Sequence, residues 1–335
     1  MIPKRSKTVN QVVSVDLDTQ IYEFNFKQEE PEEALIITVD HKKVCSLGGL
    51  VVLTGKPKAR KTTFLHSFIG SALIKSPIFS IYTDLPDNKN KVVLIDTEQS
   101  NYDLYRSMSR LSYSINIPIN NLPDKNFTLY STRSLDTKAT VDLIDQILKN
   151  NSDIGLLCID SLLDLVTDIN DVVEAKNIIN KIKNWLDTYK IGIITVIHQS
   201  KSTNFSLGHL GSFASRFCQS ELSIEKNSDL SSTLQATYLR SDENFNPVNI
   251  FYSEPERIYK QVLHSKTQII TEMDHRSVVD KLFNARAIYT YKDLLSDLKQ
   301  VYPDQSAYWV QNNLVPYLYE HKFIIKHKSG ILKYR

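Results

Sequence analysis

The sequence lacks the features of a membrane protein and of a disulfide-stabilised secreted protein. Its 335 residues contain no window close to the roughly 18 uninterrupted apolar residues that a membrane span requires. The basic first residues, MIPKRSKTVNQ, are not followed by the apolar run of a signal peptide. The cysteines are few and scattered, with no CxxC pair: Cys45, Cys158 and Cys218. We therefore expect a cytoplasmic protein with reduced core cysteines and no membrane association.

A strong overall charge is also missing, since the net charge is +2 and says nothing about nucleic-acid binding. The length suits one large domain followed by one small domain. The last fifteen residues carry only positive charges, with no Asp or Glu, at Lys322, Lys326, Lys328, Lys333 and Arg335. We therefore expect any nucleic-acid contact of the small domain to use this end of the chain.

From Gly48 onward, apolar β-branched runs alternate with amphipathic helical stretches. The expected strands are 50–53, 92–95, 128–130, 156–159 and 191–197, and the expected helices are 62–74, 102–111, 140–149 and 172–189. Such alternation predicts an α/β domain with a mostly parallel, twisted sheet covered on both faces. After Leu207, consecutive strand-like runs predict antiparallel strands that extend the sheet. We place this domain at residues 46–262, after lead-in strands at residues 1–45 that pack against it.

The C-terminal residues 274–335 have a different pattern. Three expected helices, 276–284, 291–301 and 306–320, precede a hairpin, FIIKHK–SG–ILKYR. This order is typical of a small winged helix-turn-helix domain, with Pro316 kinking the third helix. Polar residues near the start of the third helix and the lysines of the hairpin favour DNA as its ligand. A protein-binding role for this domain remains the alternative.

A candidate phosphate loop follows the first strand of the large domain. Leu50–Thr63 reads LVVLTGKPKARKTT, close to the pattern G-x-x-x-x-G-K-[ST]. Backbone N–H groups of such a loop surround phosphates, while Lys61 would contact the β- and γ-phosphates and Thr62 would bind Mg²⁺. Arg60 stands where the second glycine belongs, so a left-handed backbone there would be strained. The predicted nucleotide contacts are Gly55, Lys56, Pro57, Lys58, Ala59, Arg60, Lys61, Thr62 and Thr63.

Three later strands end in polar side chains that could complete an ATPase site. VVLIDTEQ delivers Glu98, which could orient the attacking water. GLLCIDS ends in Asp160, a Walker B carboxylate that would hold Mg²⁺. IGIITVIHQSK ends in His198, which could sense the γ-phosphate. Each motif alone is also compatible with an ordinary polar turn, but their order along the chain favours the ATPase interpretation.

These motifs together resemble the RecA superfamily of P-loop ATPases, specifically the RepA-like hexameric replicative helicases of plasmids and mobile elements. The resemblance extends over residues 15–260 and is carried by GKPKARKTT, IDTEQ, IDSLLDLVTDIND and HQSK…GHLGS. It implies a RecA-like core, catalytic roles for Glu98 and His198, and metal binding by Thr62 and Asp160.

The resemblance also implies contacts outside the nucleotide loop. Lys201–Ser212 matches a mobile loop that faces DNA in the central channel of such rings, which gives Lys201 and His209 as DNA contacts. Arg240 occupies the position of a basic finger that reaches the ATP of a neighbouring subunit, with Arg216 or Lys260 as alternatives. Lys326, Lys328 and Lys333 are the predicted DNA contacts of the winged helix.

The sequence therefore predicts a motor that uses ATP and Mg²⁺ and acts on DNA, most simply a replicative helicase of a mobile element. It would assemble as a hexamer, with single-stranded DNA in the channel and duplex DNA at the winged helix. Two alternatives remain open. The chain could use ATP to assemble on DNA as a regulator or recombination factor without unwinding it, or it could be a degenerate nucleotide-binding scaffold.

Overall fold

The computed structural model describes residues 32–199, 208–254, 258–262, 275–302, 310–320 and 322–333. It also describes the single positions 23, 24, 26, 29 and 307. Met1–Ala34 form one unit by contacts and Leu35–Arg335 another. The lead-in runs expected at VVSVDL and IYEFNF lie almost entirely outside the described residues. Among the described helices, none combines the length and the apolar character needed to cross a membrane.

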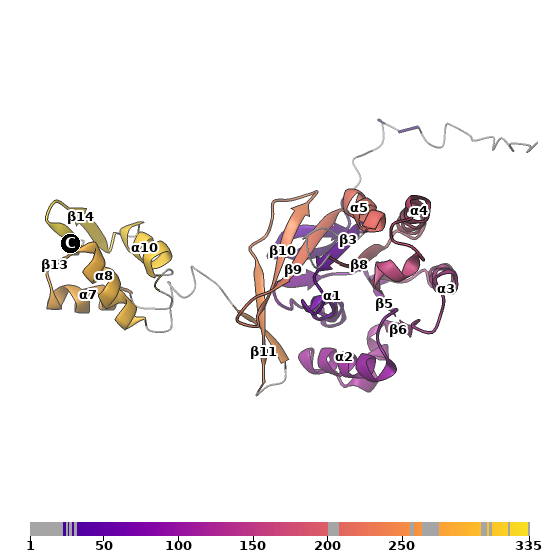
Figure 1. Cartoon of the computed structure of the whole chain (residues 1–335), viewed down its shortest axis with the longest axis horizontal. Helices are drawn as coiled ribbons and strands as arrows, with labels where there is room; N and C mark the ends of the chain where they lie inside the picture. Colours follow the sequence, from indigo (N-terminus) through magenta and orange to yellow (C-terminus); the bar gives the residue numbers. More distant parts are fainter. Residues whose placement is uncertain are drawn as a thin grey trace, which may run out of the picture. The chain divides into compact units, whose positions relative to one another are not determined.

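The described part of the chain contains a nine-stranded sheet that dominates the large domain (Figure 1). Its spatial order is β12 (Ile258–Val262), β11 (Val248–Ser253), β10 (Ser232–Leu239), β9 (Ser220–Lys226), β3 (Leu50–Gly55), β8 (Gly192–His198), β7 (Ile154–Asp160), β5 (Lys91–Asp96) and β6 (Phe127–Ser131). The neighbours from β9 to β6 pair in parallel, whereas β9 to β12 pair antiparallel. The predicted α/β fold with a mostly parallel sheet is confirmed.

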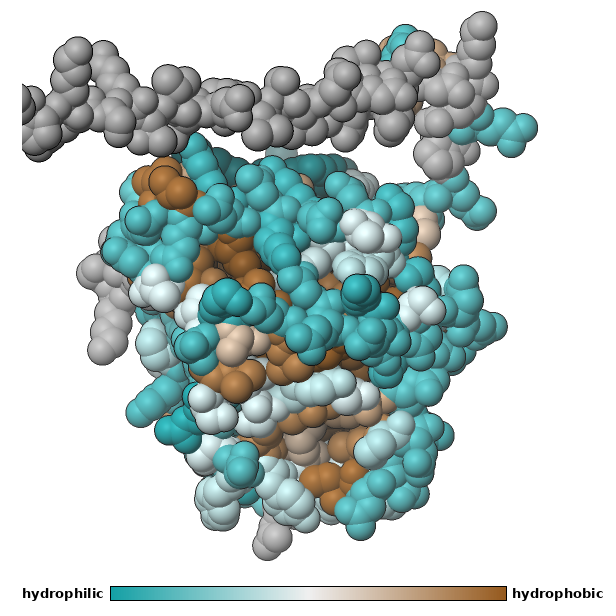
Figure 2. Space-filling model, turned by 90° about the vertical axis from the view of Figure 1, so that its right-hand side faces the viewer, coloured by the Kyte–Doolittle hydropathy of each residue, from teal (hydrophilic) through white to brown (hydrophobic). Residues whose placement is uncertain are grey.

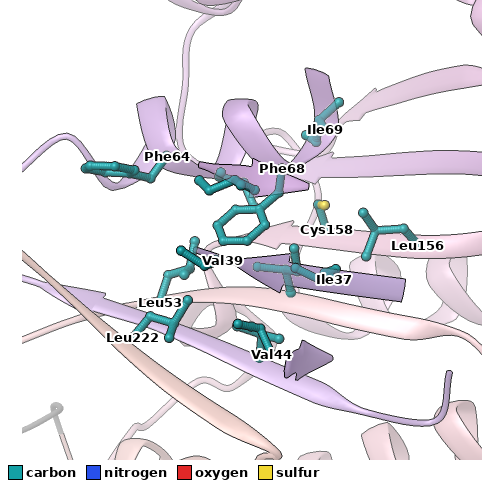
Figure 3. Close-up of a cluster of buried hydrophobic side chains, with 14 of the residues drawn as sticks. Ile37, Val39, Val44, Leu53, Phe64, Phe68, Ile69, Leu156, Cys158 and Leu222 are labelled. Atoms are coloured by element: carbon teal, nitrogen blue, oxygen red, sulfur yellow. The ribbon is translucent and has the colours of Figure 1, made fainter. Parts of the chain in front are cut away.

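Helices cover both faces of this sheet because its central strands are apolar on both sides. The helices are α1 (Lys61–Ile74), α2 (Asn101–Ser114), α3 (Thr137–Asn150), α4 (Val172–Tyr189) and α5 (Gly208–Phe217). Along β3, Val51 and Leu53 join the cluster under α1 and α2, while Leu50 and Val52 join the cluster under α3, α4 and α5. Figure 3 shows the first cluster, with Phe64 and Phe68 of α1 above the sheet.

A second, three-stranded sheet has the order β2 (Lys42–Ser46), β1 (Leu35–Val39) and β4 (Ile81–Thr83). Ile37, Val39 and Val44 from this sheet are buried in the same cluster as α1 (Figure 3). Residues 35–45 thus contribute to the same core as the large domain. The sequence does not predict the short β4, because three residues carry no readable periodicity.

Helices α2, α3 and α4 each begin after a polar residue whose side chain caps the helix. The side chains of Ser100, Asp136 and Asp171 accept backbone N–H bonds at the starts of α2, α3 and α4. Such caps satisfy N–H groups that have no partner within the helix. Short 3₁₀ turns lie at Asp87–Lys89, Ile119–Asn121, Pro123–Lys125 and Leu162–Leu165.

Figure 2 shows one face of the molecule, where hydrophobic patches lie recessed between hydrophilic side chains.

Two expectations for the middle of the chain need correction. Residues 201–207 lie outside the described residues, but Gly208–Ser212 begin helix α5 and are not part of a loop. Leu210 and Gly211 are buried there, so packing against the sheet fixes this segment. Because α5 reverses the chain, β9 runs parallel to β3, and only β10, β11 and β12 add antiparallel pairs.

The C-terminal segment contains α7 (His275–Ala285), β13 (Ile288–Tyr289), α8 (Tyr291–Val301), a π-helical turn (Val310–Leu314), α10 (Val315–Glu320), β14 (Ile324–His327) and β15 (Gly330–Lys333). A three-stranded sheet, in the order β13, β15, β14, joins the expected hairpin to a strand between the helices. The third expected helix changes pitch just before Pro316, since proline has no N–H to donate to the preceding turn. The winged-helix assignment itself stays a prediction.

Candidate functional site

The ends of four strands meet at one edge of the parallel sheet because the strands are in matching register. Gly55 at the end of β3 is paired with His198 of β8, and Asp96 of β5 is paired with Asp160 of β7. Carboxyl ends of parallel strands are where open α/β sheets bind ligands. The predicted motifs therefore come together at this edge although they lie far apart in the sequence.

The phosphate loop begins at a glycine that no other residue could replace without a shift. A Cβ atom on Gly55 would lie 2.5 Å from the carbonyl oxygen of Ile224 on the neighbouring strand. Lys56, Pro57 and Lys58 then form an exposed turn, and Ala59 is buried beneath it. The loop is thus exposed to solvent just before α1.

Arg60 occupies the left-handed region with φ 75° and ψ 32° at the residue that precedes α1. A non-glycine residue in this conformation costs roughly 1–2 kcal/mol, so the strain suggested by the missing glycine is present. The guanidinium carbon of Arg60 lies 5.1 Å from the ring centre of Tyr259, and Nη1 donates to Ser232 Oγ at 3.4 Å. These contacts with β10 and β12 offset part of the backbone strain.

Lys61 is the first residue of α1, and its side chain is buried under the loop. Its Nζ donates to the carbonyl oxygens of Gly55 at 2.9 Å and Lys56 at 3.1 Å, and lies 3.1 Å from Nδ1 of His198. Burial lowers the pKa of this ammonium, while the nearby carboxylates of Asp160 and Glu98 act in the opposite direction. Nζ is thus held inside the loop by acceptors that a phosphate oxygen could replace.

Thr62 and Asp160, the two predicted metal ligands, are in direct contact. The hydroxyl of Thr62 donates to Asp160 Oδ2 at 2.9 Å. Asp160 is 5% exposed, and burial raises its pKa to about 6. A buried carboxylate beside a hydroxyl, next to a phosphate-binding loop, fits Mg²⁺, which needs few protein ligands besides water and phosphate oxygens. These two residues would hold the ion.

His198 links Lys61 to Glu98. Its Nδ1 faces Nζ of Lys61, and its Nε2 lies 3.1 Å from Oε1 of Glu98. An ammonium can only donate, so Nδ1 accepts and Nε2 carries the proton that it donates to Glu98. This hydrogen bond is the main cause that lowers the pKa of Glu98, which keeps the carboxylate ionised and able to act as a base.

Residues that the sequence analysis did not assign hold this site in shape. Asp96 Oδ1 accepts the backbone N–H groups of Glu98 at 3.2 Å and Gln99 at 2.8 Å, which fixes the turn that carries Glu98. The hydroxyl of Thr97 accepts from the N–H of Ser161 at 2.9 Å and so ties the end of β5 to the end of β7. Both residues belong to IDTEQ, where Asp96 and Thr97 support the turn that carries Glu98.

Gln199 also supports the site. It follows His198 and is 8% exposed, and its Nε2 donates to Thr54 Oγ1 at 3.2 Å next to the loop. In the sequence, the only indication of this supporting role is the polar side chain that follows His198 within HQSK.

The residues predicted to contact DNA or a neighbouring subunit are not part of this cluster. Arg240 follows the last residue of β10, and that end of β10 pairs with the start of β9. Arg240 therefore lies at the end of the sheet opposite the phosphate loop. His209 is exposed on α5, and Lys201 lies outside the described residues. In the C-terminal segment Lys326 and Lys328 are exposed, whereas Lys333 forms an ion pair with Asp280.

Comparison with known proteins identifies the kind of domain that carries the strand-end cluster. Residues 26–204 match the family described as AAA domain, a range that covers the loop, Glu98, Asp160 and His198. No curated protein matches the chain significantly. The family match indicates a nucleotide-binding ATPase domain.

Proposed function

The chain belongs to the AAA domain family, and we propose that it binds ATP with Mg²⁺ and hydrolyses it at the carboxyl edge of its parallel sheet. The observation that carries this proposal is the register of the strands, which pairs Gly55 with His198 and Asp96 with Asp160. It gathers a lysine, a hydroxyl and two carboxylates around the start of one helix, the set that phosphoryl transfer needs.

Phosphate binding would begin with an exchange of partners at Lys61. Its Nζ now rests on two loop carbonyls and His198, all neutral acceptors. A triphosphate brings negative charge to the same position and competes for the ammonium. The start of α1, a helix of 14 residues, adds N–H groups and a favourable dipole.

Thr62 and Asp160 would hold Mg²⁺ beside the β- and γ-phosphates. When bound, the ion would neutralise part of the charge that develops on the phosphates. The cation would also offset the buried negative charge of Asp160, whose oxygens it would share with the hydroxyl of Thr62.

Glu98 would accept a proton from the water that attacks the γ-phosphorus, with ADP as the leaving group. In the structure its carboxylate is held by His198, which is held in turn by Lys61. Movement of Lys61 onto a phosphate would therefore release His198 from one of its two partners. This chain of contacts provides a physical route by which the loop could report its occupancy to the base.

We further propose that the ATPase is a motor on DNA, a hexameric replicative helicase of the RepA-like kind. This finer proposal rests on the motif resemblance, on the exposed Lys326 and Lys328 of the hairpin and on the exposed His209. An ATP-dependent DNA-binding regulator or recombination factor that does not unwind DNA is the second candidate. The intact Lys61, Thr62, Glu98 and Asp160 argue against a scaffold without turnover.

Turnover of ATP by the full chain, with and without single-stranded DNA, separates these candidates. A motor should hydrolyse ATP faster when single-stranded DNA is added and should separate a forked duplex. A regulator should turn over ATP and bind DNA without unwinding the fork. Lys61→Ala is the matched control, and it should lose both ATP binding and turnover. Absence of turnover in the wild-type chain under all conditions would overturn the enzymatic proposal.

A further inference from the structure

A pocket of about 250 Å³ opens directly beside the phosphate loop. It lies between the first turns of α1, the helix α2 and the edge strand β12, and its lining includes Thr62 and Thr63. Those residues immediately follow Lys61, so a nucleotide with its phosphates on the loop would have its sugar within reach of this pocket. Gln99, which directly follows Glu98 in the chain, also lines the pocket.

The pocket contains a buried polar group that lacks a partner. His66 lines it from α1 and is 7% exposed, and its Nε2 has no hydrogen-bond partner among the described residues. Buried polar atoms in folded proteins are nearly always paired, so an unpaired atom beside a cavity is available to bind a group that enters the cavity. Burial and the nearby Arg110 lower the pKa of His66 to about 4, so the ring is neutral near pH 7 and offers one donor and one acceptor.

The remaining lining suits a flat ligand with polar edges. Tyr259 of β12 contributes an aromatic ring, and Arg60 lies against that ring at 5.1 Å. Leu111 adds an apolar wall, while Ser67 and Ser107 add hydroxyl groups. Among the described residues Arg110 is the one cation of the lining, which does not suit a second polyphosphate. Aromatic and apolar walls with a few polar groups are the usual surroundings of a heteroaromatic base.

We propose that this pocket takes the purine base and sugar of the bound nucleotide, and that His66 reads the edge of the base. The inference rests on the proposed ATPase function and names the part of the site that selects the nucleotide. His66 is then a specificity-determining residue, separate from the residues that bind phosphate. Tyr259, with Arg60 behind it, supplies the surface against which the base packs.

The test is calorimetric titration of the full chain with ATP and with inorganic tripolyphosphate, each in the presence of Mg²⁺. Tripolyphosphate has no base, so its binding reports only the loop. His66→Leu removes the ring nitrogens at similar volume and should weaken ATP binding about tenfold, the equivalent of one lost hydrogen bond. Ser107→Leu fills the pocket from α2 and should weaken ATP binding at least as much. Both variants should bind tripolyphosphate like the wild-type chain.

Ser109→Leu is the matched control, since Ser109 lies on the same helix but donates to the carbonyl of Tyr105 and does not line the pocket. It should bind both ligands normally. Unchanged ATP affinity in folded His66→Leu and Ser107→Leu would overturn the pocket assignment while leaving the ATPase proposal intact. A wild-type chain that binds neither ligand would overturn the ATPase proposal and this inference together. Should Ser107→Leu lose tripolyphosphate binding as well, its fold is disturbed, and His66→Leu alone decides.

Discussion

Replacing Asp160 by asparagine should stabilise the protein without nucleotide while abolishing its Mg²⁺-dependent activity. Asp160 is 5% exposed, and desolvation is the main cause that raises its pKa from the ordinary 3.8 to about 6. At neutral pH the folded chain must therefore keep an ionised carboxylate in a place that disfavours the charge. The asparagine side chain would have nearly the same shape, could still accept the hydroxyl of Thr62, and carries no charge.

The size of the effect follows from the pKa values. The difference between 3.8 and about 6 corresponds to about 3 kcal/mol at 1.36 kcal/mol per tenfold change. The unfolded chain loses the proton of Asp160 first, so between these values the folded state binds more protons than the unfolded one. The contribution of Asp160 to stability therefore falls as the pH rises from about 4 to about 6 and stays low above that. Asp160→Asn should gain up to about 3 kcal/mol at pH 8, and this gain should vanish near pH 4.

Urea denaturation followed by circular dichroism, at several pH values from 4 to 8 and without Mg²⁺ or nucleotide, measures this difference. Asp187→Asn is the control, because Asp187 is exposed on α4 and its replacement should change stability by less than about 0.5 kcal/mol. A variant that is less stable than the wild-type chain at pH 8 would refute the reasoning, as would a gain that does not depend on pH.

Other predictions concern the loop, the subunit interface and the hairpin. Arg60→Gly relieves the strain of a left-handed backbone but loses the contact with Tyr259. ATP turnover, measured by phosphate release, should therefore stay close to wild type. A large gain in turnover would instead favour the degenerate scaffold, in which Arg60 impairs hydrolysis. Arg240→Ala should bind ATP normally but turn it over about 10³-fold more slowly, and mixing it with Lys61→Ala subunits should restore some activity. No recovery in mixtures that co-assemble by native mass measurement would contradict a finger acting between subunits. Neutralising Lys326 and Lys328 should weaken DNA binding and flatten its salt dependence, more than replacing Lys333, which is paired with an aspartate; an unchanged salt slope would point to a protein partner.

The elements that the sequence predicts best are those whose local pattern and packing agree. The helix expected at 172–189 matches α4 at both ends, because an apolar stripe coincides with a capping residue, Asp171. The strands expected from continuous apolar runs are present because β3, β7 and β8 are buried on both faces. Here each residue's own neighbourhood in the chain already specifies its environment.

Features that depend on contacts between distant segments could not be predicted from the sequence. The local sequence at the start of α5 is typical of a loop. Its burial comes from packing against the sheet and α4, which the local sequence does not reveal. The hydrogen-bond chain from Lys61 through His198 to Glu98 joins the start of α1 to the end of β8 and to the turn after β5. His66 has the pattern of an ordinary helical residue, and only the approach of α2 and β12 makes its ring a lining of the pocket. Motif order predicts which residues meet, but not how they are paired.

The proposed catalytic site is tested most simply by the rate of ATP hydrolysis by the full chain with Mg²⁺, compared with that of Glu98→Gln. The substitution keeps the size of the side chain and a hydrogen bond to His198 but removes the base. We expect Glu98→Gln to bind ATP with an affinity close to wild type and to hydrolyse it about 10²–10⁴-fold more slowly. Hydrolysis at the wild-type rate would show that Glu98 is not the catalytic base and would contradict the proposed site.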